Sequence, residues 1–162
     1  MIAIIDYKAG NLTSVKLAFD ALGVPVEITS APERIMAAER VIFPGVGAAG
    51  SAMNTLSGSG LAGAIRNVAD SGRPFLGICL GCQIVLERSE ENKTDCLGIL
   101  PGAVRKFMPV SPRDKVPQMG WNSVKLVKKS HPMFKGIEDN SEFYFVHSYY
   151  PVPADKGLVL GE

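Results

Sequence analysis

Apolar segments that alternate with amphipathic ones constrain the fold of the first half of this chain more than any other feature. Four segments have the continuous apolar, β-branched composition of buried strands: residues 1–6, 26–29, 40–45 and 74–78. Between them the sequence predicts three helices: one capped by Asn11, one starting at Pro32, and one striped by Leu61, Ala64, Ile65 and Val68. A fourth helix is predicted to follow at 80–88, and residues 44–51 read as a Gly-rich loop. Alternating buried strands and helices predict an α/β fold in three layers, a mostly parallel sheet with helices on both faces.

After about residue 97 the pattern changes to strands separated by turns. Strands are predicted at 102–107, 123–127, 142–150 and 157–162, with a short helix at 131–137. We interpret this half as antiparallel additions to the same sheet. The sequence shows no internal repeat and no linker, so residues 1–162 are expected to form a single domain.

Composition narrows the class of function. The formal net charge of +1 gives no electrostatic reason to expect nucleic acid or an anionic membrane as a partner. No apolar stretch is long enough to cross a bilayer, and the first residues lack the basic leader of a signal peptide. Three cysteines without framework spacing fit free thiols in a reducing compartment. We therefore expect a cytoplasmic protein.

The segment Gly77-Ile78-Cys79-Leu80-Gly81 has the form G-x-C-x-G at a predicted strand-to-helix junction. This is the thiol version of a nucleophile elbow, in which a tight turn exposes the reactive side chain and the glycines permit close backbone approach. The start of the following helix favours a thiolate and offers free N–H groups to an oxyanion. The pattern predicts that Cys79 is a nucleophile.

Three other interpretations of Cys79 compete with this one. A cysteine after a strand is often only a small core residue, but two flanking glycines favour the nucleophile. Cys79 and Cys82 could form a redox pair, although such a pair does not need glycines around its first member. A metal site is disfavoured, because Cys96 is the only other thiol and no paired histidines supply further ligands. We predict no metal and no cofactor.

Several separated motifs resemble a known family. Residues 77–83, "GICLGCQ", resemble the nucleophile motif of class I (triad-type) glutamine amidotransferases, whose fold is flavodoxin-like. Residues 43–53, "FPGVGAAGSAM", resemble their oxyanion strand and loop. Three further segments are similar to the glutaminase subunits of imidazole glycerol phosphate synthase, in histidine biosynthesis: "IAIIDYKAGNLTSV" at 2–15, "VPQMGWN" at 116–122 and "FYFVHSYY" at 143–150.

The resemblance implies a reaction and a partner. Cys79 would attack the side-chain amide of glutamine to form a γ-glutamyl thioester, which water then hydrolyses. The released ammonia would pass to a (β/α)8-barrel cyclase subunit. By motif position, Gly45, Val46 and Gly47 form the oxyanion strand, and a main-chain N–H there joins that of Leu80.

The resemblance also implies contacts with substrate and partner. Gln83 and Glu91 correspond to residues that hold glutamine, and Ser148 and Tyr149 to residues that meet its α-amino and carboxylate end. From the residues alone, Glu91 could equally belong to a solvated charged loop. A surface that packs on the cyclase is expected around the sole tryptophan, at Met119, Gly120, Trp121 and Asn122.

The chain departs from the family pattern in three ways. Gln118 stands where the family usually has His, and Cys82 where it has Met or His. The family's catalytic His and Glu occupy an F-H-P-E motif near residue 180, which lies outside these 162 residues. His131 has Met133 where the Glu should be, and His147 lies on a predicted strand well ahead of the expected position. Neither is predicted to be the triad base.

We therefore expect a glutamine amidotransferase domain that lacks its C-terminal segment, and we expect residues 1–162 alone to be inactive. Two alternatives stay open at this point: a binding or regulatory subunit in which Cys79 is unused, and a cysteine redox protein of flavodoxin-like fold.

Overall fold

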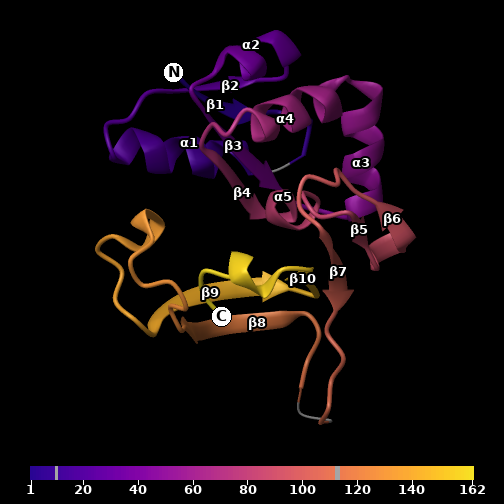
Figure 1. The fold of residues 1–162 in the computed structure, drawn as a ribbon, viewed down its shortest axis with the longest axis vertical. Helices are drawn as coiled ribbons and strands as arrows, with labels where there is room; N and C mark the ends of the chain where they lie inside the picture. The colour runs from indigo at the N-terminus through magenta and orange to yellow at the C-terminus, as the bar shows by residue number, and fades with distance from the viewer. Residues whose placement is uncertain (10, 112–113) are drawn as a thin grey trace.

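The computed structural model describes residues 1–9, 11–111 and 114–162. Its first half contains a parallel sheet in the order β2-β1-β3-β4 (Figure 1). The strands are β1 (Ile2–Ile5), β2 (Val26–Thr29), β3 (Arg40–Gly45) and β4 (Phe75–Cys79). The helices are α1 (Leu12–Ala21), α2 (Pro32–Ala37), α3 (Ala49–Gly58), α4 (Leu61–Asp70) and the short α5 (Leu80–Gln83). The predicted α/β class and parallel sheet are confirmed.

The helix signals in the sequence act as expected. The Asn11 side chain caps α1 by accepting a hydrogen bond from the Ser14 amide at 3.2 Å, and Pro32 occupies the first turn of α2. All four residues of the predicted α4 stripe are buried. On α1 the apolar residues Leu12, Val15 and Phe19 are only half-buried, and Leu22 just after the helix is exposed.

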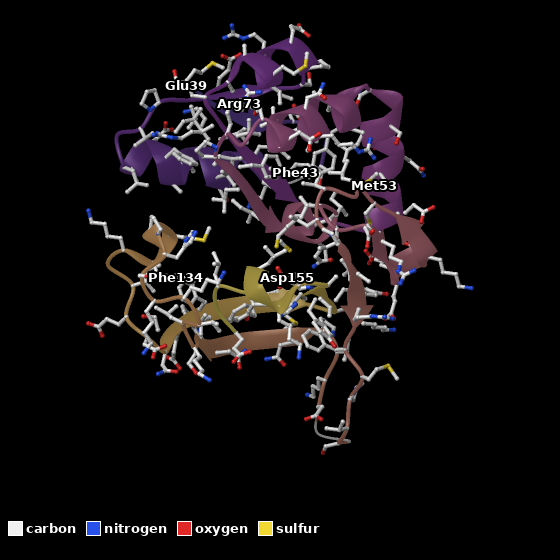
Figure 2. The ribbon with its side chains drawn as sticks, viewed as in Figure 1. Glu39, Phe43, Met53, Arg73, Phe134 and Asp155 are labelled. Carbon is white, nitrogen blue, oxygen red and sulfur yellow. The ribbon has the colours of Figure 1, made fainter. Side chains whose placement is uncertain are left out.

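The core of the first half lies between the sheet and its helices. Phe43 of β3 is fully buried near the centre, where its ring packs against Phe75 at 6.0 Å between centroids (Figure 2). Met53 and Leu56 of α3 cover the same cluster. This burial of apolar surface is the main stabilising contribution to the sheet that carries Cys79.

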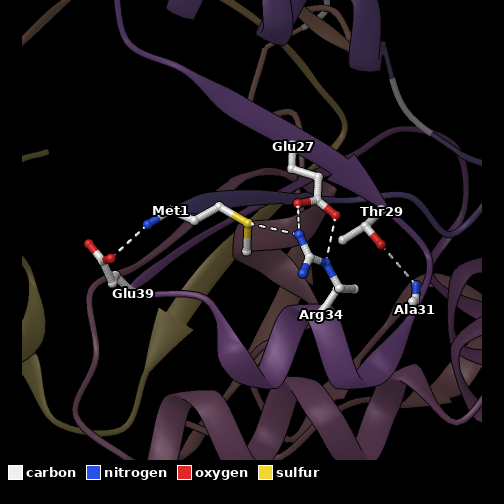
Figure 3. A network of polar contacts seen from close by, with 6 residues as sticks. All are labelled: Met1, Glu27, Thr29, Ala31, Arg34 and Glu39. Carbon is white, nitrogen blue, oxygen red and sulfur yellow. Dashed lines mark hydrogen bonds and ion pairs between the residues drawn. The ribbon is translucent and has the colours of Figure 1, made fainter.

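Salt bridges and hydrogen bonds tie α2 to the N-terminal strands (Figure 3). The Arg34 guanidinium forms an ion pair with Glu27 of β2, with Nε donating to Oε1 at 2.9 Å. The N-terminal ammonium of Met1 pairs with Glu39 at 2.7 Å. The Ala31 amide donates to Thr29 Oγ1 at 3.2 Å just before α2 begins. These groups are largely exposed, so they fix orientation more than they add stability.

Two predictions about the helices were wrong. Residues 49–51, which are predicted as the end of a Gly-rich loop at 44–51, form the start of α3 (Ala49–Gly58); burial of Ala52, Met53 and Leu56 against the core stabilises this helix in spite of its low intrinsic propensity. Conversely, α5 ends at Gln83 instead of residue 88, because the chain turns there to reach a separate sheet. The sequence also predicts that Cys79 follows a central strand of the parallel sheet, but β4 lies at the end of the strand order.

The second half forms two further sheets, so the expectation that it extends the first sheet was wrong. One contains β5 (Arg88–Ser89), β6 (Thr94–Asp95), β7 (Gly102–Lys106) and β10 (Tyr149–Pro153), in the order β10-β7-β5-β6. The other is the antiparallel pair β8 (Gln118–Val124) and β9 (Ser141–His147). Short 3-10 helices, η1–η3, cover Glu91–Lys93, Pro132–Phe134 and Lys156–Leu158.

Strand boundaries in this half also differ from those predicted. The expected strand at 142–150 is divided at Ser148, because β9 pairs with β8 while β10 pairs with β7. Strand β8 begins earlier than expected, at Gln118, and residues 157–162 contribute a 3-10 turn and a single bridge between Leu126 and Gly161. In Figure 1 the β8–β9 pair lies below the parallel sheet, with α5 between the two parts.

Candidate active site

The strand-to-helix elbow predicted at Cys79 is present. Cys79 is the last residue of β4 and the N-cap of α5, with φ +54° and ψ −115°. Such angles are uncommon and costly for a residue with a side chain, and they are characteristic of functional sites. In the sheet register Gly45, the last residue of β3, lies directly opposite Cys79. The carboxyl ends of two neighbouring parallel strands thus bring the thiol and the predicted oxyanion strand together.

The glycines around Cys79 are required by close backbone contacts. A Cβ atom at Gly81 would lie 1.8 Å from the Phe43 carbonyl oxygen, and one at Gly77 would lie 2.7 Å from the Cys82 Cα. Both distances are far below van der Waals contact with atoms that cannot move aside. The elbow therefore packs directly on β3 and on its own helix, which holds the position of Cys79.

Cys79 opens onto two adjoining cavities of about 420 and 510 Å³. Both lie between the elbow and the β9–β10 segment of the second half. The smaller one brings together most of the residues singled out in the sequence: Val46, Gly47, Cys79, Leu80, Gln83, Glu91, Ser148 and Tyr149. These positions come from four separate stretches of sequence, and the fold gathers them around one thiol.

Gln83 and Glu91 do not face solvent as free side chains. Gln83 is 9% exposed, and its Nε2 donates to the Tyr149 carbonyl oxygen at 3.3 Å. This hydrogen bond joins α5 to β10 across the cavity. Glu91 accepts a hydrogen bond from the Ala49 amide on Oε2 at 2.7 Å, at the start of α3. A carboxylate at a helix N-terminus is favourably placed, and this one fixes α3 beside the predicted oxyanion loop.

Of the two histidines, His147 lies in the site. Its ring lines both cavities with Cys79, and its Nδ1 lies 2.9 Å from the Tyr149 carbonyl oxygen, to which it donates in the corresponding tautomer. The sequence motif gave this position no catalytic role. His131 instead caps η2, where its Nδ1 accepts from the Met133 amide at 3.2 Å, and it does not line either cavity.

The other two thiols differ from Cys79 in their surroundings. Cys82 lines the larger cavity, and its partial removal from water, together with the nearby charge of Cys79, raises the pKa of its thiol. Cys96 is buried in the core, and this burial raises its pKa to about 11. Because a thiolate is the nucleophilic form, Cys96 is unreactive at neutral pH in the folded protein.

The β8–β9 pair presents an exposed apolar face next to the cavities. Met119 and Trp121 are 61% and 67% exposed, and the register places them opposite Val146 and Tyr144, which are also exposed. Trp121 meets Tyr144 edge-on at 5.6 Å. Tyr144 and Val146 were not predicted from the sequence; the alternation within "FYFVH" indicates them only once the pairing of this segment with β8 is known. We name these four residues the hairpin patch.

Other features of the described residues add no second site. A cavity of about 490 Å³ lies among residues 107–109 and 114–119, away from Cys79. Across the described ranges, no cluster of three His, Cys, Asp or Glu side chains is arranged to hold a metal ion. In the same part of the chain, none of the helices has the length and apolar character needed to cross a membrane.

Comparison with known proteins identifies the class. The family model for glutamine amidotransferase class-I matches residues 3–160. A crystal structure of a glutamine amidotransferase superposes with a TM-score of 0.70, covering 99% of this chain and 79% of that one at 17% identity, which supports the fold alone. The chain belongs to the class I glutamine amidotransferases.

Sequence relatives place it within that class. It is 52% identical to imidazole glycerol phosphate synthase subunit HisH of Nitratidesulfovibrio vulgaris (strain DP4), over 98% of this chain and 76% of the relative. It is 53% identical to the HisH subunit of Desulfovibrio desulfuricans, over 99% of this chain and 75% of the relative. The chain is a member of the HisH family.

Proposed function

We propose that the protein is the glutaminase subunit of an imidazole glycerol phosphate synthase, with Cys79 as its nucleophile. The observation that carries the proposal is the cavity in which Cys79, at the elbow, faces the Gly45–Gly47 segment and Gln83. Neither a redox pair nor an unused cysteine requires a positive φ at Cys79 or an oxyanion loop directly opposite it.

The geometry suits attack on a carboxamide. The Cys79 thiolate adds to the side-chain carbonyl of glutamine, and the oxygen that becomes negative lies where the amides of the Val46 loop and of Leu80 at the start of α5 can stabilise it. The C–N bond then breaks, and ammonia leaves after the nitrogen takes a proton. Water attacks the γ-glutamyl thioester, which releases glutamate and restores the thiol.

The remaining cavity residues would select the substrate. Ser148 and Tyr149, where β9 passes into β10, would meet the α-amino and carboxylate end, and Gln83 and Glu91 the other polar groups of glutamine. The hydrogen bonds of Gln83 with Tyr149 and of Glu91 with Ala49 hold these two side chains in place, so the site is largely preorganised before substrate binds.

We expect millimolar glutamine to slow iodoacetamide alkylation of Cys79 at least about fivefold, with asparagine, one methylene shorter, giving less than twofold protection. In the Gln83→Ala variant glutamine should lose most of its effect, because the α5–β10 link and one polar contact disappear. Rates are measured by mass spectrometry of the Cys79 peptide. Equal protection by both amides would contradict a glutamine site.

Turnover needs a group that protonates the leaving nitrogen, whereas reaction of Cys79 with an alkylating agent does not. We propose that neither histidine serves as the triad base, because His131 lies away from the cavities and His147 is oriented at Nδ1 by the Tyr149 carbonyl, where a triad base is oriented by a carboxylate. A polypeptide of residues 1–162, mixed with the cyclase, should therefore still be alkylated by iodoacetamide at Cys79. It should release no ammonia from glutamine above background, because loss of the base lowers the turnover rate by about three orders of magnitude or more. Turnover that disappears in His147→Gln would show instead that His147 is the base.

The hairpin patch is proposed to dock on the cyclase, whose (β/α)8 barrel would receive the ammonia. Tyr144 and Val146 belong both to the patch and to the wall of the larger cavity, so a partner seated there would cover the mouth of the site. Exclusion of water from that contact would keep ammonia from being protonated and lost. We place its site of action in the cytoplasm, a reducing compartment in which free thiols persist.

A further inference from the structure

The Tyr7 hydroxyl is a buried polar group that the reaction described above does not use. Tyr7 follows β1, is 2% exposed, and packs its ring against Phe43 at 5.6 Å between centroids. Among the described residues its hydroxyl makes no well-formed hydrogen bond, although the Val46 amide lies close enough to lower its pKa. Phenylalanine would fill the same space without burying an unpaired polar atom, so the hydroxyl calls for an explanation.

The hydroxyl lies between the two segments that carry the predicted oxyanion amides. A Cβ atom at Gly45 would be 2.6 Å from the Tyr7 oxygen and 2.8 Å from the Gly81 amide nitrogen, so the hydroxyl occupies the space where a side chain at Gly45 would lie. The same Cβ would lie 3.0 Å from the Leu80 Cβ at the start of α5, and Val46 follows Gly45 directly in the chain.

The electrostatic surroundings agree with this placement. Burial raises the pKa of Tyr7 to about 12, the neighbouring Val46 amide opposes that rise, and the charge on Cys79 adds to it. The phenol therefore stays neutral throughout the working range of a cytoplasmic enzyme and cannot act as a base. Its oxygen remains a neutral dipole beside the Val46 amide.

We propose that the Tyr7 hydroxyl is a positioning group of the oxyanion hole, which holds the Gly45–Val46 segment at a set distance from the start of α5. The proposal deepens the function given above and rests on it. If the oxygen is removed, the loop can move toward α5, and the main-chain amides of the Gly45–Gly47 segment lose their spacing from the Leu80 amide. The thiol of Cys79 is held by β4 and is unaffected.

Two electrophiles separate the oxyanion hole from the thiol. A glutamine-shaped chloromethyl ketone places its ketone oxygen in the hole while the Cys79 sulfur bonds to carbon and chloride leaves. Iodoacetamide forms the same kind of S–C bond with loss of iodide and needs no oxyanion stabilisation. In Tyr7→Phe we expect the ketone rate at Cys79 to fall about 3- to 30-fold, less than the 10²–10³ typical for outright loss of an oxyanion donor. The iodoacetamide rate should stay within about twofold.

Tyr150→Phe is the matched control, because Tyr150 stacks on Phe107 and lines neither cavity with Cys79. It should leave both rates unchanged. The melting temperature of Tyr7→Phe should be unchanged or higher, since an unpaired hydroxyl is removed. An unchanged ketone rate, or a lower rate accompanied by a lower melting temperature, would overturn the proposal. If Cys79 of the wild-type protein reacts no faster with the chloromethyl ketone than with iodoacetamide, the proposed function fails, and this proposal fails with it.

Discussion

Gly81→Ala is expected to prevent stable folding of the first half of the chain. The new Cβ would be placed 1.8 Å from the Phe43 carbonyl oxygen, and both atoms belong to backbone that is fixed by the β3–β4 register and by α5. The only relief is displacement of α5 from the sheet, which would break the burial of Leu80 and Ile84. We expect a loss of about 4 kcal/mol or more in the free energy of unfolding, a large part of the total stability of a domain.

Gly63→Ala provides the control for this change. Gly63 lies within α4 and has no atom within 4 Å of an added Cβ, so alanine there should raise stability by about 0.5–1 kcal/mol through helix propensity. Both variants are compared by urea denaturation followed by circular dichroism. A Gly81→Ala protein as stable as wild type would mean that the elbow does not pack on β3 as described.

Trp121→Ala is expected to weaken association with the cyclase about 30- to 1,000-fold, which corresponds to about 2–4 kcal/mol. Trp121 is the largest side chain of the hairpin patch and is two-thirds exposed. Its edge-on contact with Tyr144 orients the ring. An exposed aromatic that is already ordered loses little entropy on docking. Because the side chain lies outside the core, the melting temperature of the free subunit should change little.

The measurement is a titration of each variant with the cyclase subunit by isothermal calorimetry. Met36→Ala is the matched control: Met36 is also an exposed apolar residue, but it lies on α2, at the opposite end of the molecule from β8 and β9 (Figure 1). It should bind like wild type. A Trp121→Ala variant that binds with wild-type affinity would remove the hairpin patch from the interface.

The sequence was most informative where local pattern and tertiary environment agree. The four parallel strands are continuous apolar runs, and a parallel sheet covered by helices is the structure that buries such runs. The meeting of Cys79 with Gly45 could also be predicted, because both residues lie at the carboxyl ends of such strands and the carboxyl ends of parallel strands share one edge.

Long-range pairing limited prediction elsewhere. Helix α3 is stabilised by the core and not by its own composition, so its first residues, 49–51, are predicted as part of a loop. The hydrogen bond between Gln83 and Tyr149 joins residues 66 positions apart, and the division of 142–150 between two sheets depends on partners far along the chain. Tyr7 was missed for the same reason: its hydroxyl is significant only because Gly45 and Gly81 converge on it.

The most direct test of Cys79 as the nucleophile of a glutamine site is to map where the glutamine-shaped chloromethyl ketone reacts. The protein carries three free thiols, so Cys82 and Cys96 serve as internal controls within the same chain. After digestion, mass spectrometry should show one adduct, on Cys79, formed at neutral pH, suppressed by glutamine, absent in Cys79→Ala and retained in Cys82→Ala. Labelling that is spread equally over Cys79 and Cys82, or that glutamine does not slow, would contradict the account.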